Sequence, residues 1–296
     1  MGKNINDWIE KNDVTDFDIK NLICSNTGLT SLEGIEKFTN LKYLRCDYNL
    51  LESLKGVENC VHLEELICYN NKSLTSLKGI DDLLNLTSIQ SSDCKLTSLE
   101  EIEKLVKLEE LNVRHNEITS LKELADKVEL YKLDFGDNKI SKLHGLERLS
   151  KLRQLFCFGN GLTSLKGIEG LINLNVLSCS ENEITKLEGI EHLSKLTMLY
   201  CANNKLTSLE GIEELTNIKT INCSANNLQN FKGIEKLQNL EDFFCKDTPY
   251  SKYYEGMSAQ EIVSKVWVEI HLNPDDDERG TASIMDTGLF DFKMTK

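Results

Sequence analysis

The stretches LKYLRCDYN at residues 41–49 and LNVLSCSEN at residues 174–182 fit one template, L-x-x-L-x-C-x-x-N. The position that ends the template recurs every 22 residues, except for one interval of 23 that carries an extra residue within 71–74. This column holds Asn49, Asn71, Asn116, Asn138, Asn160, Asn182, Asn204 and Asn226, with Thr27, Cys94 and Thr248 at the other turns. A fixed period of this kind predicts a solenoid with one turn per repeat.

Each repeat continues with a second leucine-rich segment, such as LTSLEGIEEL at residues 206–215. A glycine recurs in it at positions 34, 56, 79, 145, 167, 189, 211 and 233, and Glu101 and Glu123 replace it twice. One turn cannot bury its own leucines, so each turn stacks on the next and the strands form one parallel sheet about 4.8 Å apart. Eleven such strands make an arc roughly 50 Å long.

This pattern resembles the leucine-rich repeat, specifically the 22-residue class typified by SDS22-like proteins and internalins, over about residues 19–250. The resemblance implies an α/β fold, a curved horseshoe of about eleven turns with a parallel concave β-sheet and a cap at each end. Repeat-only bacterial effectors of the Yersinia, Shigella and Legionella type are similar in size. The family implies a protein-binding function, and SDS22-like members bind a phosphatase as a regulatory subunit.

We expect residues 1–18 to form the N-terminal cap, 19–250 the solenoid, and 251–296 a C-terminal cap with an acidic tail. Ile5, Trp8 and Ile9 have helical spacing and would cover the first turn. Ser258 and Glu261 form a capping-box pattern ahead of an apolar segment that suits a helix. The same segment alternates from 266 to 272 as a strand would, so both assignments stay open. The corner asparagines are expected to bond backbone groups that the tight bend leaves unpaired.

The charge balance excludes some classes of function. The chain has 34 Lys and Arg against 48 Asp and Glu, a net charge of −14. Such a field disfavours general binding of nucleic acid or anionic membrane and favours a basic protein partner. No stretch approaches the 18 apolar residues of a membrane span, and the N-terminus lacks the apolar core of a secretory signal. We therefore expect a cytoplasmic monomer without membrane insertion, or a protein translocated into a host cell without a Sec signal.

Eight of the ten cysteines share one repeat position, the last inward site of the strand, where Ser91, Val113 and Phe135 stand at other turns. A site that accepts Val and Phe is a core site, and buried cysteine behaves as a small hydrophobe. A single file of parallel side chains does not converge on a zinc ion, and its Cβ vectors do not suit disulfides. We therefore expect no metal and no cofactor. The acidic run 275–278 is either a solvated loop or a C-terminal translocation signal.

Residues between the inward ones face the concave side, because side chains alternate along a strand. These positions hold two apolar groups and, between them, a charged belt of Glu110, Arg114, His115, Lys132, Asp134 and Asp137. Exposed apolar patches with aromatic, Met and Arg residues mark protein interfaces. The predicted partner-binding residues are Tyr43, Arg45, Ile67, Tyr69, Arg114, His115, Asp134, Phe156, Phe158, Val176, Met198, Tyr200 and Phe244. The alternatives are scattered surface apolar residues, or contact with a C-terminal tail folded over the arc.

The sequence has no phosphate loop, H-E-x-x-H motif or nucleophile elbow. Only His115 of the five histidines falls near the concave face, beside Arg114, Asp134 and Asp137. We therefore predict a non-enzymatic module, a bacterial effector or effector regulator, whose concave face binds a folded protein, such as an enzyme, and masks or modulates its active site. An SDS22-like phosphatase scaffold is one alternative, and a small enzyme that uses the His115 belt is another.

Overall fold

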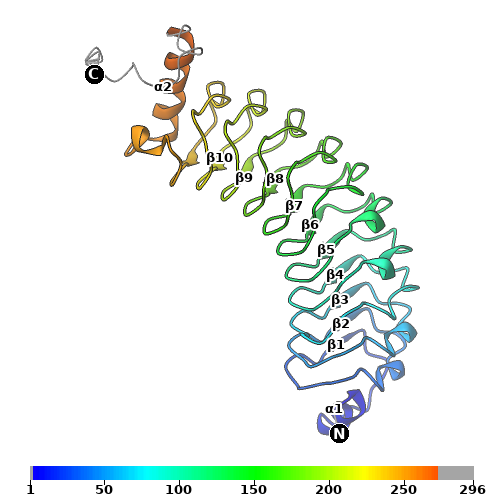
Figure 1. Ribbon diagram of the computed structural model, residues 1–296. Helices are drawn as coiled ribbons and strands as arrows, with labels where there is room; N and C mark the ends of the chain where they lie inside the picture. The colour runs from blue at the N-terminus through cyan, green and yellow to red at the C-terminus, as the bar shows by residue number, and fades with distance from the viewer. Residues whose placement is uncertain (1–2, 273–296) are drawn as a thin grey trace.

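The computed structural model describes residues 3–272. It shows a single curved solenoid with α1 (Ile5–Lys11) at one end and α2 (Ala259–Leu272) at the other (Figure 1). Eleven three-residue strands follow one another along the chain: β1 (Asn21–Ile23), β2 (Tyr43–Arg45), β3 (Glu65–Ile67), β4 (Ser88–Gln90), β5 (Glu110–Asn112), β6 (Lys132–Asp134), β7 (Gln154–Phe156), β8 (Val176–Ser178), β9 (Met198–Tyr200), β10 (Thr220–Asn222) and β11 (Asp242–Phe244).

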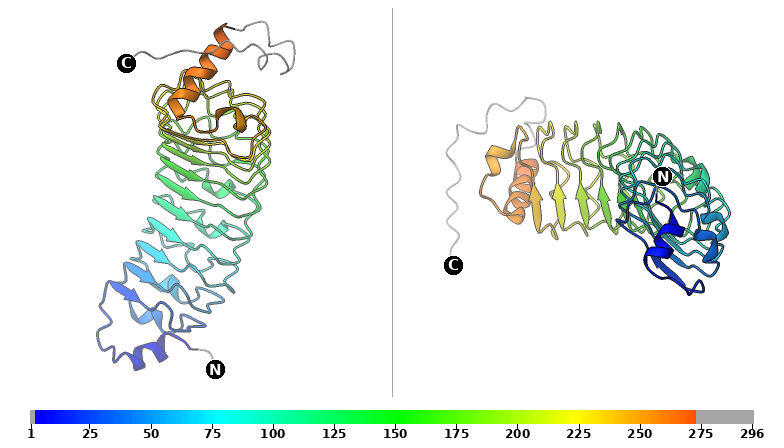
Figure 2. Two further views of the ribbon diagram at one scale, coloured as in Figure 1. Left: turned by 90° about the vertical axis from the view of Figure 1, so that its left-hand side faces the viewer. Right: turned by 90° about the horizontal axis from the view of Figure 1, so that it is seen from below.

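All eleven strands form one sheet in sequence order, and every neighbouring pair is parallel. Partners lie 22 residues apart, as in Tyr43 and Glu65, except between β3 and β4, where Glu65 pairs with Ser88. The strands stack into a ladder on the inner side of the arc (Figure 2). The predicted horseshoe with a parallel concave sheet, including the position of the extra residue, is confirmed. We number each turn by its strand.

The outer side of each turn is irregular or forms a short 3₁₀ helix. These helices are η1 (Ile35–Lys37), η2 (Val57–Asn59), η3 (Glu100–Ile102) and η4 (Lys122–Leu124), with η5 (Ser251–Tyr254) after the last strand. Gly211 illustrates the bend that precedes most outer segments, because its φ of 105° suits glycine and its N–H donates to Glu213 Oε2 at 2.8 Å. Where Glu101 and Glu123 replace this glycine, η3 and η4 begin two residues earlier in the repeat than η1 and η2 do.

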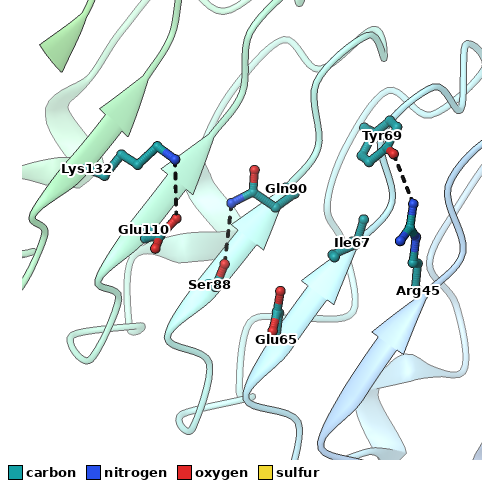
Figure 3. Close-up of a pocket in the computed structure, with 8 residues that line it drawn as sticks. All are labelled: Arg45, Glu65, Ile67, Tyr69, Ser88, Gln90, Glu110 and Lys132. Carbon is teal, nitrogen blue, oxygen red and sulfur yellow. Dashed lines mark hydrogen bonds and ion pairs between the residues drawn. The ribbon is translucent and has the colours of Figure 1, made fainter. Parts of the chain in front are cut away.

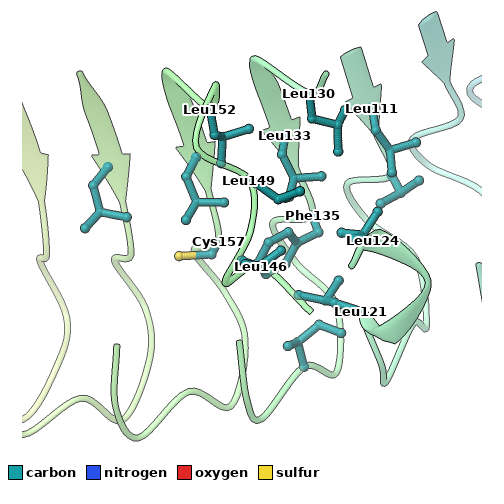
Figure 4. Close-up of a cluster of buried hydrophobic side chains, with 14 of the residues drawn as sticks. Leu111, Leu121, Leu124, Leu130, Leu133, Phe135, Leu146, Leu149, Leu152 and Cys157 are labelled. Atoms are coloured by element: carbon teal, nitrogen blue, oxygen red, sulfur yellow. The ribbon is translucent and has the colours of Figure 1, made fainter. Parts of the chain in front are cut away.

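The core is one continuous column of leucines between the sheet and the outer segments (Figure 4). Leu133, Leu155 and Leu177, the central residues of three successive strands, have no exposed surface. Burying a leucine side chain stabilises the fold by about 2 kcal/mol, and each turn supplies several. Stacking therefore holds each turn in place through its two neighbours.

The corner asparagines connect successive turns. Asn182 donates from Nδ2 to the carbonyl oxygens of Cys157 at 3.0 Å, Cys179 at 3.1 Å and Ser180 at 3.0 Å, and its Oδ1 accepts from the Leu162 N–H at 3.0 Å. Asn116, Asn138, Asn204 and Asn226 repeat this pattern. Each side chain thus satisfies backbone groups in its own turn and the previous one, as the sequence predicted.

Turn 4 departs from this pattern at two linked positions. Cys94 replaces the corner asparagine, so no amide oxygen can accept from the N–H of Leu74, twenty residues earlier. The extra residue in 71–74 solves this locally, because the Leu74 N–H donates to the Asn71 carbonyl at 2.9 Å instead. The one-residue insertion and the loss of one asparagine therefore compensate each other.

The cysteine column is buried as predicted, apart from its last member. Cys157, Cys179, Cys201 and Cys223 are fully buried, and Cys245 on the last turn is half-buried. Burial raises the pKa of the Cys179 thiol to about 12, which keeps it protonated and unreactive at neutral pH. All ten cysteines are unpaired, and no group of three or more metal-binding side chains lies within residues 3–272.

Both ends of the solenoid carry a helix. Asn4 and Asp7 form a capping box for α1, which buries Ile5 and Ile9 against the first turn. The helical assignment of the C-terminal segment is correct and the strand alternative is wrong, because α2 spans 259–272 and buries Ile262, Val263 and Val266. The Ser258 N–H donates to Glu261 Oε2 at 2.7 Å, as the capping box predicted. No helix within residues 3–272 has the length and apolar character needed to cross a bilayer. The acidic run 275–278 lies outside the described residues.

Two substitutions at the corner position of the repeat test how much the corner asparagines stabilise the solenoid. Asn182→Ala should lower the free energy of unfolding by about 2–4 kcal/mol, because it removes four hydrogen bonds and leaves the buried Leu162 N–H without a partner. Cys94→Ala should cost only about 1 kcal/mol, since the Leu74 N–H already has another partner. Chemical denaturation monitored by circular dichroism measures both. Equal losses would contradict the role assigned to the asparagines.

The cysteine column predicts a selective thiol reaction. In the native protein at pH 8, Ellman's reagent should modify one thiol, Cys245, much faster than the others, because the other nine are buried. The Cys245→Ser variant should lose this fast phase, and denaturant should expose all remaining thiols. Several fast-reacting thiols in the native protein would show that the column is open to solvent.

Candidate functional site

The concave face is built from the residues that flank each buried strand centre. In β2 to β8 the central residue is buried and both neighbours are partly exposed, which is the alternation expected of a sheet with one face in water. The structure places the predicted binding residues on these strands or just after them. They are Tyr43 and Arg45 on β2, Ile67 on β3, Asp134 on β6, Phe156 on β7, Val176 on β8, Met198 and Tyr200 on β9, Phe244 on β11, and Tyr69, Arg114, His115 and Phe158 directly after their strands.

Turns 7 to 9 carry the apolar patch, which consists of Phe156, Phe158, Val176, Met198 and Tyr200. Met198 is 38% exposed and the other four are half-buried, because neighbouring side chains pack against one another. The patch is therefore less exposed than the sequence alternation predicted. Val176 and Met198 lie side by side on paired strands, and Tyr200 Oη lies 3.7 Å from Met198 Sδ.

Phe158 is held in place by its neighbours. Its ring lies over Gly136, where an added Cβ would come within 2.5 Å of the ring. The Arg114 guanidinium lies 4.6 Å from the centre of the same ring, a cation–π contact. The glycine in turn 6 and the arginine in turn 5 thus position an aromatic side chain of turn 7. Sequence reasoning did not predict this arrangement.

Phe244 lies apart from the residues of the patch, two turns beyond Tyr200 on β11. Asn222 on β10 pairs with both Tyr200 and Phe244 and so separates them. Phe244 is 52% exposed on the last strand. The binding role of Phe244 stays a prediction.

The charged belt follows β5 and β6. Asp137 Oδ2 lies 3.2 Å from Arg114 Nε and 3.3 Å from His115 Nε2. Asp134 accepts from the Gly136 N–H at 2.9 Å, and burial raises the pKa of its carboxyl group. His115 and Asp137 form an imidazole–carboxylate pair, but no hydroxyl or thiol bonds to His115 within the described part of the chain. The described part of the belt thus shows an imidazole paired with a carboxylate and no hydroxyl or thiol bonded to that imidazole.

Tyr43, Ile67 and Tyr69 form the N-terminal patch, organised by a buried carboxylate that the sequence reasoning missed. Asp47 is 1% exposed and accepts from Arg45 Nε at 2.8 Å and from the Ser25 hydroxyl. Burial acts to raise the pKa of Asp47, but these hydrogen bonds outweigh it and hold that pKa below its usual value. Arg45 Nη2 in turn donates to Tyr69 Oη at 3.2 Å. The sequence signal for this arrangement is the spacing of Asp47 two residues after Arg45, which places both side chains on the same side of the strand.

A hollow of about 450 Å³ lies on turns 3 to 5, between Arg45 and Lys132 (Figure 3). Its lining includes Glu65, Ile67, Tyr69, Ser88, Gln90 and Glu110. The hollow exists because Ser88 is the shortest side chain of its column between two glutamates in register, Glu65 and Glu110. The sequence shows that a short side chain stands between two long ones, but it does not show that the space above Ser88 stays open.

Comparisons with known proteins agree with the geometry. A family model described as leucine-rich repeats (2 copies) matches residues 150–192, 172–214 and 194–242. The comparison with curated proteins gave no match.

Three solved structures from Listeria monocytogenes and Arabidopsis thaliana are similar. The internalin InlF of Listeria has 20% identity and a TM-score of 0.65, over 78% of this chain and 81% of that chain. The functional domain of InlJ from Listeria, described as including a cysteine ladder, has 27% identity and a TM-score of 0.63, over 77% and 53%. The ectodomain of the Arabidopsis receptor kinase GASSHO1/SCHENGEN3, solved with CASPARIAN STRIP INTEGRITY FACTOR 2, has 22% identity and a TM-score of 0.63, over 78% and 33%.

The repeat template, the eleven-stranded parallel sheet and the matching family model lead to one conclusion. The chain is a leucine-rich-repeat protein.

Proposed function

We propose that this protein is a non-enzymatic binding module whose concave face holds a folded protein partner. The apolar patch of turns 7 to 9 carries the proposal. Phe156, Phe158 and Tyr200 occupy positions that face water, where stability of the solenoid requires no aromatic side chain. Aromatic side chains that are already fixed lose little entropy on binding, and the contacts of Phe158 with Gly136 and Arg114 fix it.

The shape and charge of the chain favour a particular kind of partner. A curved parallel sheet presents a broad surface that fits a rounded domain better than a flat one. The net charge of −14 favours a basic partner through long-range attraction. We infer an enzyme whose active site the horseshoe covers, with the chain acting as a bacterial effector or effector regulator in a cytoplasm. Ten unpaired cysteines are compatible with such a reducing compartment.

Two alternatives have different consequences. As an SDS22-like scaffold, the chain would bind a phosphatase without blocking its active site. As a small enzyme, it would depend on the pair of His115 and Asp137, whose Nε2 and Oδ2 atoms lie 3.3 Å apart. The lack of an adjoining nucleophile in the described belt favours the binding module. A His115→Ala variant that keeps full cellular activity, beside an inactive Phe156→Ala variant, would exclude the enzyme.

The patch predicts which substitutions weaken binding. Phe158→Ala and Tyr200→Ala should each cost about 1–3 kcal/mol of binding free energy, an increase in Kd of roughly 5- to 150-fold. Val106→Ala is the matched control, because Val106 is 54% exposed but lies on the outer part of turn 4. Affinity capture with each variant, followed by titration calorimetry on the captured protein, measures the effect. If both patch variants bind like wild type while their melting curves are unchanged, the face assignment is wrong.

A further inference from the structure

The hollow on turns 3 to 5 contains a carboxylate without a counter-ion. Within residues 3–272 no hydrogen bond or ion pair reaches the carboxylate of Glu65. Partial burial and the nearby Glu110 raise the pKa of its carboxyl group. A half-buried carboxylate beside another one is stabilised by any cation that enters the space between them.

The positive groups at the two ends of the hollow leave Glu65 unpaired. Arg45 is bound to Asp47 at 2.8 Å and to Tyr69 at 3.2 Å, so its guanidinium is fixed at that end. Lys132 Nζ lies 3.8 Å from Glu110 Oε2, and the Tyr131 hydroxyl donates to the other oxygen of Glu110. Figure 3 shows Glu65 between these two ends, next to Ile67 and Ser88.

The spacing of the two glutamates selects among cations. Glu65 and Glu110 each pair with Ser88, so they stand two strand spacings apart, about 9.6 Å between backbones. A single metal ion needs oxygen ligands within about 2.6 Å, and no metal-binding group of three side chains lies in the described part of the chain. A guanidinium is wide enough to donate to carboxylates on both sides, at about 2.8 Å each. Its aliphatic stem can pack on Ile67, and its plane can stack on an aromatic ring such as Tyr69.

We propose that the hollow on turns 3 to 5 receives an arginine side chain of the protein partner, which pairs with Glu65 and Glu110. The proposal rests on the proposed function and adds a second anchor to the apolar patch. Ser88 on turn 4 and Val176 on turn 8 are separated by four strand spacings, about 19 Å. The partner therefore carries an arginine about 19 Å from the apolar segment that contacts turns 7 to 9.

The test uses the full chain with isoleucine δ1 methyl groups labelled with ¹³C and a defined probe, Nα-acetyl-arginine N-methylamide. The Ile67 methyl resonance, assigned with Ile67→Val, should shift in a saturable way as the probe is added. Nα-acetyl-citrulline N-methylamide has nearly the same shape without the charge and should bind at least about fivefold more weakly. That factor corresponds to an ion pair worth about 1 kcal/mol.

Variants locate the effect. Glu65→Gln should weaken probe binding at least about fivefold. Asp242→Asn, which removes an exposed carboxylate from the same column on β11, should leave it unchanged. A Glu65→Gln variant that binds like wild type, equal binding of citrulline, or the absence of a saturable shift would each overturn the proposal. Because the probe does not touch the apolar patch, such a failure is distinct from failure of the Phe158 and Tyr200 variants to weaken partner binding.

Discussion

The hydrogen bonds of the corner asparagines are the constraint on which the rest of the structure depends. A chain that bends sharply after every three-residue strand leaves backbone groups without partners, and these groups are buried. Asn182 resolves this with one side chain that reaches two successive turns. Because the same solution recurs at nearly every turn, the strands stay in register along the whole arc.

This constraint separates stability from recognition. Leucines, cysteines and asparagines point inward and hold the backbone, so the residues between them are free to vary. These residues form two surfaces, the apolar patch on turns 7 to 9 and the hollow on turns 3 to 5. Turns 5 and 6 connect them, and there Arg114, Asp137 and Gly136 position Phe158. The concave face is thus a preorganised surface on a rigid support.

The fold was predictable from the sequence because the leucines, cysteines and asparagines that build it recur at fixed positions of each repeat. This recurrence predicted the strand spacing of 22 residues, the place of the single extra residue and the burial of the cysteines. Contacts between columns were not predictable. The packing of Phe158 over Gly136 joins two turns, and the burial of Asp47 depends on Arg45 and Ser25. Side-chain size and reach, not periodicity, decide such contacts.

The central claim is that the concave face is the surface that binds a partner, and hydroxyl-radical footprinting of the complex tests it most directly. Met198 on β9 and Tyr69 after β3 are reactive side chains on that face, and the His144 side chain, which is 81% exposed on the outer part of turn 6, is the internal control. We expect partner binding to lower the oxidation of Met198 and Tyr69 and to leave that of His144 unchanged. Protection of His144 with Met198 and Tyr69 still oxidised at the free-protein rate would contradict it.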